Sequence, residues 1–258
     1  MIETDRRRAL RAGAALAAAS VLTAGCAATG GAPARARPPT SGIPRPAPAA
    51  APAPHRFPGR PVQITHGTRT RPDVALTFHG QGDPATAKAL LAQAEKAGAR
   101  VTVLAVGTWL DEHPGLARRI LDGGHDLGNH TLRHLDINTM SETDAYAEIT
   151  GCADRLRRLT GSIGTWFRPS RTRTATPLVE RLARRAGYPH VLSYDVDSLD
   201  HTSPGAPAIT RKIAAEVRAG SVVSLHFGYA DTVAALPDVL QELERRGLHA
   251  VTTTELLT

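Results

Sequence analysis

The chain has 258 residues, 41% of them hydrophobic, which suits one sizeable folded domain. Its formal net charge of +7 is concentrated near the start, because residues 1–60 hold nine arginines against two acids, whereas the remaining residues hold 22 basic and 22 acidic side chains. A domain without net charge lacks the basic surface that binds a polyanion, so the composition argues against nucleic acid as the partner.

The first 26 residues are typical of an export signal. An arginine-rich run at 6–11 precedes a stretch of small apolar residues at 12–24, which ends in Gly25-Cys26. This stretch is shorter than the roughly 20 apolar residues of a membrane-spanning helix, and its layout matches a secretory signal. The paired arginines resemble a twin-arginine signal, and "LTAGC" resembles a bacterial lipobox with Cys26 as the lipidated residue. We therefore expect a protein that is exported and lipid-anchored at the outer face of the cytoplasmic membrane; an ordinary cleaved signal is the alternative. We also expect the protein to be a monomer.

Residues 27–60 are rich in alanine, proline and glycine and show no periodicity, which predicts a disordered tether. The folded domain is then expected over residues 61–258. Cys152 is the only cysteine besides Cys26, which argues against a disulfide framework after processing. Its position within a helical pattern predicts a buried, unreactive thiol.

From residue 61 onward, short apolar runs alternate with amphipathic segments. In chain order, the pattern predicts a strand at 74–78, a helix at 84–97, a strand at 101–106, a helix at 114–121, a strand at 126–128, a helix at 141–159, a strand end at 166–167, a helix at 176–187, a strand at 191–194, a helix within 204–219, a strand at 221–225, a helix at 232–246 and a strand at 250–253. Such alternation indicates a parallel sheet or barrel.

Ionisable residues follow nearly every predicted strand. They are His79, His130, His134, Arg168, Asp195, Asp197, Asp200 and His226. The carboxyl ends of parallel strands meet at one edge of the fold, where such proteins carry their chemistry. The sequence thus predicts a single polar site built from these residues.

His130 and His134 stand four residues apart, a spacing that can direct two imidazoles at one metal ion. The spacing alone is also compatible with one histidine capping a turn and the other facing solvent.

Five short motifs together are specific. "LTF" at 76–78, "GNHTLRH" at 128–134, "FRP" at 167–169, "DVDSLDH" at 195–201 and "SLHFG" at 224–228 resemble, in order and spacing, the polysaccharide deacetylase family. This is the NodB homology domain of carbohydrate esterase family 4, and the resemblance covers residues 62–258. It implies an α/β fold, a distorted (β/α) barrel, and metal-dependent removal of N- or O-acetyl groups from amino-sugar polymers.

The resemblance also implies roles for individual residues. His130 and His134 match the family's metal ligands, and Arg168 matches the arginine that orients the catalytic base. Asp200, with Asp197 as a second candidate, matches the acid that tunes a histidine. His226 matches that histidine, which protonates the leaving amine.

The first motif departs from the family, because His79 and Gly80 stand where two catalytic carboxylates are expected. Three interpretations remain open for His79: a third metal ligand in a three-histidine site, the general base, or the remnant of an inactive site. Asp83 is expected to cap a helix, with metal ligation as the alternative. Two further departures are the segment 170–172, which replaces a Pro-aromatic-Gly turn, and His201, which replaces a tryptophan.

We predict a hydrolase of the deacetylase type that uses a divalent metal, with zinc favoured, on acetylated cell-envelope glycan such as peptidoglycan. Arg171 and Trp166 are predicted to contact this substrate. The alternatives are a catalytically inactive glycan-binding lipoprotein on the same barrel and an O-acetyl esterase. The histidines outside the motifs are interpreted as surface or turn residues: His55, His66, His113, His125, His190 and His249.

Overall fold

The computed structural model describes residues 51–258. The predicted signal, the lipidation site Cys26 and most of the predicted tether lie outside these residues. Within 51–258, no helix has both the length and the apolar character needed to cross a membrane.

Parallel strands form the centre of the fold. The main sheet runs in the order β4 (Asp126–Asn129), β3 (Thr102–Ala105), β2 (Asp73–Gly80), β7 (Val222–His226) and β6 (Val196–Asp197), and β8 (His249–Val251) also pairs with β2. A second pair joins β1 (Gln63–Ile64) to β5 (Val191–Leu192). Single bridges connect the two parts, because Phe167 bridges both β4 and β5, and His66 bridges Ser221 just before β7. The predicted class, an α/β fold with a distorted barrel, is confirmed.

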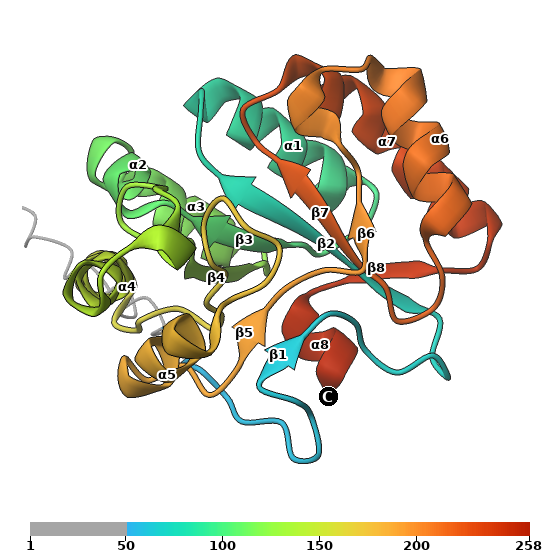
Figure 1. Ribbon diagram of the computed structural model, residues 1–258. Helices are drawn as coiled ribbons and strands as arrows, with labels where there is room; N and C mark the ends of the chain where they lie inside the picture. Colours follow the sequence, from blue (N-terminus) through green and yellow to red (C-terminus); the bar gives the residue numbers. More distant parts are fainter. Residues whose placement is uncertain (1–50) are drawn as a thin grey trace, which may run out of the picture. The chain divides into compact units, whose positions relative to one another are not determined.

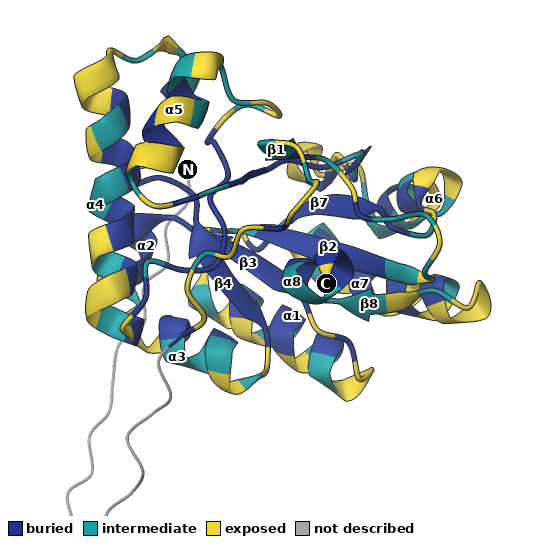
Figure 2. Ribbon diagram, turned by 90° about the horizontal axis from the view of Figure 1, so that it is seen from below, coloured by how far each residue is buried: buried dark blue, intermediate teal, exposed yellow. Residues whose placement is uncertain are grey.

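Helices surround the strands (Figure 1). They are α1 (Pro84–Lys96), α2 (Gly107–Glu112), α3 (Gly115–Asp122), α4 (Glu142–Thr160), α5 (Pro177–Arg185), α6 (Ala206–Glu216), α7 (Ala230–Arg245) and α8 (Thr253–Leu257). Buried residues concentrate on the strands and on the inward helix faces, and exposed residues lie on the outside (Figure 2). Residues 74–78 of β2 are all buried, which explains why this strand is a continuous apolar run.

Local sequence signals explain the helix boundaries. The Asp83 carboxylate accepts the Ala85 N–H, and Pro84 occupies the first turn of α1, as predicted. Ser141 caps α4 in the same way. Cys152 lies inside α4, where burial raises the pKa of its thiol to about 12, so the prediction of a buried, unreactive cysteine is confirmed. The short helices α2 and α8 escaped prediction because five or six residues are too few to show periodicity.

The folded part begins earlier than predicted, because residues 51–60 pack on the domain. Phe57 is 6% exposed, and its ring stacks on Trp166 with centroids 5.4 Å apart. The Ala51 N–H donates to Thr160 O at the end of α4, at 3.0 Å. The prediction of a disordered tether is therefore wrong for residues 51–60, where one aromatic anchor outweighs the Pro- and Ala-rich composition.

Two histidines interpreted as surface or turn residues are buried instead. His125 Nδ1 accepts the Val101 N–H at 3.1 Å. His190 Nε2 accepts the Phe57 N–H at 3.0 Å, and its Nδ1 donates to Pro61 O. Each ring satisfies a backbone group that lies outside any strand ladder, which explains its burial.

Candidate active site

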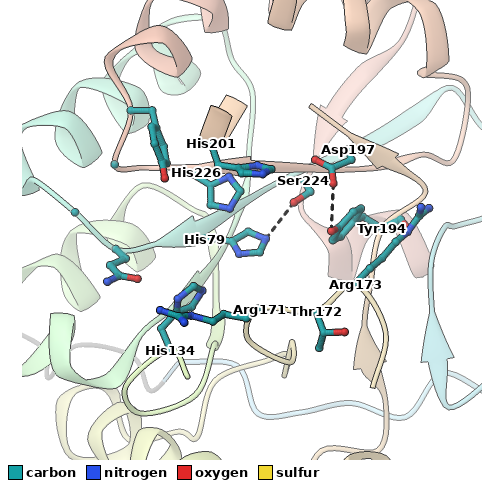
Figure 3. Close-up of a pocket in the computed structure, with 14 residues that line it drawn as sticks. His79, His134, Arg171, Thr172, Arg173, Tyr194, Asp197, His201, Ser224 and His226 are labelled. Carbon is teal, nitrogen blue, oxygen red and sulfur yellow. Dashed lines mark hydrogen bonds between the residues drawn. The ribbon is translucent and has the colours of Figure 1, made fainter. Parts of the chain in front are cut away.

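The carboxyl ends of β2 and β7 bring His79 and His226 side by side. These residues are register partners in the parallel ladder, and their ring centroids lie 4.3 Å apart. The pairing puts two motif histidines, 147 positions apart in the sequence, at one edge of the sheet. Figure 3 shows both rings in the same pocket.

His130 follows β4 and faces His79 from the other side. Its Nδ1 donates to the Arg168 carbonyl at 3.0 Å, so the lone pair of the neutral ring is on Nε2. That Nε2 is buried and has no hydrogen-bond partner, and the same holds for Nδ1 of His79. A buried nitrogen with no partner is costly unless another group binds it.

His134 completes a group of three. Its ring centroid lies 4.8 Å from that of His130. One nitrogen from each of His79, His130 and His134 can be chosen so that all three lie within 4.8 Å of one another. Imidazole nitrogens are good zinc ligands, and three of them leave a fourth position for water or substrate. The residues therefore fit a divalent metal. Asp83 does not join them, because its side chain is exposed and caps α1.

The electrostatics keep the three rings neutral, as metal ligation requires. Burial holds the pKa values of His79 and His130 well below the usual value. The neighbouring His130 lowers the pKa of His79 further, and His134 lowers that of His130 further. Burial also lowers the pKa of His134 to about 4, with the positive charge of Arg171 as the next cause.

Arg168 is fully buried and contacts His79 instead of a carboxylate. Its Nε donates to Leu192 O at 3.2 Å, its Nη2 donates to Ser193 O at 3.0 Å, and its Nη1 lies 3.3 Å from His79 Nε2. Burial lowers the pKa of this guanidinium to about 10. Arg168 thus contacts His79 near the end of β2, the position where the resemblance led us to expect a carboxylate.

His79 Nε2 has a second neighbour, the Ser224 hydroxyl at 3.1 Å. Arginine can only donate, so a bond from Arg168 needs the lone pair on Nε2 and leaves the proton on Nδ1. The Ser224 oxygen can accept a proton from Nε2, which leaves the Nδ1 lone pair free for a metal. Ser224 is thus a candidate site residue: it belongs to the "SLHFG" motif, but the sequence analysis gave it no role.

Asp200 and His226 form a hydrogen-bonded dyad. Asp200 is fully buried, and its Oδ1 lies 2.7 Å from His226 Nδ1. Its Oδ2 accepts from the His226 N–H and from the Thr232 hydroxyl, both at 2.7 Å. Burial acts to raise the pKa of Asp200, but these hydrogen bonds and the His226 ring outweigh it and hold the pKa below the usual value. The carboxylate orients the ring and leaves Nε2 for chemistry.

The other predicted acids have different partners. Asp197 accepts the Leu199 N–H at 3.0 Å and lies 3.4 Å from the Tyr194 hydroxyl, which leaves Asp200 alone beside His226. Asp195 forms an ion pair with Arg69 and has a structural role. His201 lies near His226, but the oxygens of Asp200 are already occupied, so these three residues form a poor second metal site.

A pocket of about 730 Å³ opens onto the site (Figure 3). Its lining includes His79, His134, His226, Arg171 and Tyr194. Trp166 is absent from it: this side chain is 2% exposed and packs against Phe57, and its Nε1 donates to Asp126. The prediction that Trp166 contacts the sugar is therefore wrong, whereas Arg171 lines the pocket.

The loops around the pocket hold unusual backbone conformations. Among residues 51–258, the non-glycine residues with positive φ are Thr131, His134, Arg171, Leu199 and Ser203. Thr131 and His134 follow β4, Arg171 follows the bridge residue Phe167, and Leu199 and Ser203 follow β6. Such conformations cost of order 1 kcal/mol or more each and concentrate at functional sites.

A parallel α/β barrel with polar side chains at the carboxyl ends of its strands has the architecture of many enzymes. The family model "Polysaccharide deacetylase" matches residues 66–191. A peptidoglycan-N-acetylglucosamine deacetylase of Bacillus cereus is 31% identical over 188 residues, which cover 71% of this chain and 87% of that protein. The chain belongs to the polysaccharide deacetylase family.

Further matches come from both sequence and structure. The peptidoglycan-N-acetylglucosamine deacetylase PgdA of Listeria monocytogenes is 26% identical over 73% of this chain and 39% of its own length. A family 4 carbohydrate esterase from Streptomyces lividans superposes with a TM-score of 0.64 and 26% identity over 69% of this chain and 90% of that one. A pseudoenzyme of the CE4 family from Bacillus anthracis reaches 0.72 at 22% identity, over 77% and 70% of the two chains.

Proposed function

We propose that this protein is a metal-dependent deacetylase that acts on acetylated cell-envelope glycan. The observation that carries the proposal is the convergence of His79, His130 and His134, two of them with buried and unpartnered nitrogens, beside the Asp200–His226 dyad. The relatives named as peptidoglycan deacetylases support the choice of substrate.

The three histidines would hold a divalent metal, with zinc favoured. When bound, such an ion polarises a carbonyl oxygen and lowers the pKa of water to about 7. We assign His79 to this group because an Nε2–H bond to the Ser224 hydroxyl leaves the lone pair on Nδ1, which is buried and has no hydrogen-bond partner. This assignment is favoured over a role for His79 as the general base.

His226 is the residue placed to move protons. Its Nδ1–H is held by Asp200, so Nε2 is the atom that can accept a proton and later deliver one to the leaving amine. In this tautomer Nε2 carries a proton and cannot accept from Arg168, so the guanidinium, 3.3 Å away, supports the ring of His79 by packing only.

The test uses the full chain and measures acetate. Insoluble peptidoglycan and N-acetylglucosamine oligomers would be incubated with the zinc-loaded protein, with the chelator-treated protein and with the His226→Ala variant. We expect acetate release that the chelator abolishes, that zinc restores and that the variant loses. No acetate from any substrate, with metal bound near one per chain, would overturn the proposal. O-acetylated glycan in the same assay tests the esterase alternative.

A second candidate function is glycan binding without catalysis. The observation that favours it is Gly80, which provides no carboxylate and is closely packed, because a Cβ there would lie 3.0 Å from Ala105 Cα and from Val103 Cγ1, so these neighbours would have to shift. Retention of the protein on peptidoglycan without any acetate release would support this candidate.

We also propose that the chain is exported and lipid-anchored through Cys26 and acts as a monomer. The arginine-rich start and the "LTAGC" segment support the anchor. Incorporation of labelled palmitate into the parent but not into a Cys26→Ser variant is the expected result. Light scattering on the purified protein would test the monomer.

A further inference from the structure

We propose that the pocket selects amino-sugar glycans that carry a carboxylate close to the acetamido group, and that Arg171 binds this carboxylate. This inference rests on the proposed function because it names the substrate class of the same site. The notable feature is a pocket with more arginines than carboxylates, on a domain whose basic and acidic side chains are equal in number.

The ionisable side chains that line the pocket are unequal in sign. They are two arginines, Arg171 and Arg173, one carboxylate, Asp197, and four histidines and two tyrosines. Asp197 forms no ion pair with either arginine, since its oxygens meet the Leu199 N–H and the Tyr194 hydroxyl. The pocket therefore offers two cations to a ligand and only one anion.

The two arginines differ in how many hydrogen bonds their guanidinium groups already make within the protein. Arg173 donates to the Tyr194 carbonyl through Nε at 3.2 Å and through Nη2 at 3.1 Å, and its guanidinium lies 5.2 Å from the centre of the Tyr194 ring. Arg171 is exposed, and no hydrogen bond or ion pair to any residue of 51–258 engages its guanidinium. Its donors are thus free for a ligand.

The backbone conformation fixes the position from which the Arg171 side chain extends. Its φ of 56° is a left-handed conformation, held by a segment in which the neighbouring Ser170 is buried and donates to Leu135 O. In Figure 3 the side chain extends toward His134, and its charge helps to lower the pKa of that ring. A group bound by Arg171 would therefore lie in the same pocket as His134, one of the three clustered histidines.

A carboxylate suits this position because the planar guanidinium can hold both of its oxygens at once. The fork also accepts phosphate. The test below separates these two anions.

The experiment measures both binding and acetate release with the full chain. Three soluble glycans are compared: peptide-free peptidoglycan strands with their lactyl carboxylates, the same strands with the carboxylates reduced to alcohols, and a neutral N-acetylglucosamine oligomer. Binding is measured by calorimetry at low salt and at 0.5 M NaCl. We expect the acidic strands to bind about tenfold more tightly than the reduced strands, with the preference shrinking at high salt.

Variants then assign the preference to one side chain. Arg171→Gln should reduce the ratio of acidic to reduced strands toward one, and Arg171→Lys should keep part of it. Arg181→Gln is the matched control, because Arg181 is exposed on α5 and does not line the pocket, so the ratio should stay unchanged.

The outcomes separate this inference from the proposed function. Equal binding of acidic and reduced strands, or a ratio that Arg171→Gln leaves unchanged, would overturn the inference even if acetate is released. A carboxylate preference without acetate release would support the inference and reject the deacetylase. Inorganic phosphate that competes better than lactate would assign the site to phosphate and overturn the choice of carboxylate.

Discussion

The imidazole of His79 stands at 85° to that of His130, with ring centroids 4.4 Å apart, and each ring has one buried nitrogen without a hydrogen-bond partner. A core would not keep two such nitrogens together unless a third group could bind both, because each one unpartnered costs about 1–3 kcal/mol. The pair comes from two strand ends, β2 and β4, which β3 separates.

If these rings hold a divalent metal as proposed, removal of either one should weaken its binding. We expect His79→Ala and His130→Ala each to weaken zinc affinity by more than about 100-fold, since loss even of a group that supports a ligand costs about 10- to 100-fold. Competition with a chromophoric chelator measures this directly. The control is His249→Ala, an exposed residue far along the chain and outside the pocket. Unchanged affinity in His79→Ala would return His79 to the role of base.

Stability of the metal-free protein should fall as the solution is acidified from pH 6.5 toward pH 4. The folded pKa of His134 is lowered to about 4, so between these values the unfolded chain binds a proton that the folded chain does not. Unfolding is then favoured as pH falls, with a slope of at most about 1.4 kcal/mol per pH unit for one such histidine. His79 and His130, whose pKa values are also lowered, act in the same direction.

Urea unfolding at pH 7, 6 and 5 measures this slope. Burial raises the pKa of Asp126, which has the opposite effect on stability, so the comparison with His134→Asn isolates one histidine. The variant should show a shallower slope. Parallel curves for the parent and the variant would contradict the buried, neutral state of His134.

Asp200→Asn should impair proton transfer. The amide nitrogen can donate to His226 Nδ1, which would place the ring proton on Nε2, the atom that must accept one. We expect kcat for acetate release to fall by about 10²- to 10⁴-fold. The double variant Asp200→Asn/His226→Ala should be no slower than His226→Ala alone, because both changes remove one function. Additive losses would show that Asp200 acts independently of His226.

Gly80→Ala should destabilise the protein by about 1–3 kcal/mol, because the new methyl group would lie 3.0 Å from Ala105 Cα and Val103 Cγ1 and force these neighbours to shift. The control is Gly115→Ala in α3, where a Cβ would meet no atom within 4 Å. That change should leave the free energy of unfolding unchanged or raise it slightly. An equally tolerant Gly80 would mean that the family's second carboxylate could be reintroduced there.

The sequence predicted where the site lies in the fold better than it predicted which site residues contact one another. His79 and His226 could be assigned to one edge because parallel strands end together, and caps such as Asp83 have a local signature. Ser224 could not be found in this way, since its contact with His79 depends on strand register.

Spacing also left Asp197 open as an alternative to Asp200. The two lie three residues apart, yet Asp197 accepts the Leu199 N–H whereas Asp200 bonds His226. Trp166 was misassigned for a related reason, because its ring is covered by Phe57 from a segment whose composition indicates disorder. In each case a partner distant in sequence decides the outcome.

The residues with left-handed backbone conformations around the pocket place the stability of the fold in conflict with its function. Replacing Thr131 by glycine would relieve its φ of 69° and ease the folded backbone. The same change would loosen the turn between His130 and His134, whose rings must stay in place to share a ligand, and would remove the Thr131 hydroxyl that bonds Ser170. The sequence with the highest thermal stability is therefore expected to differ from the sequence with the highest activity. Selection for thermal stability alone would be expected to replace the left-handed pocket residues first.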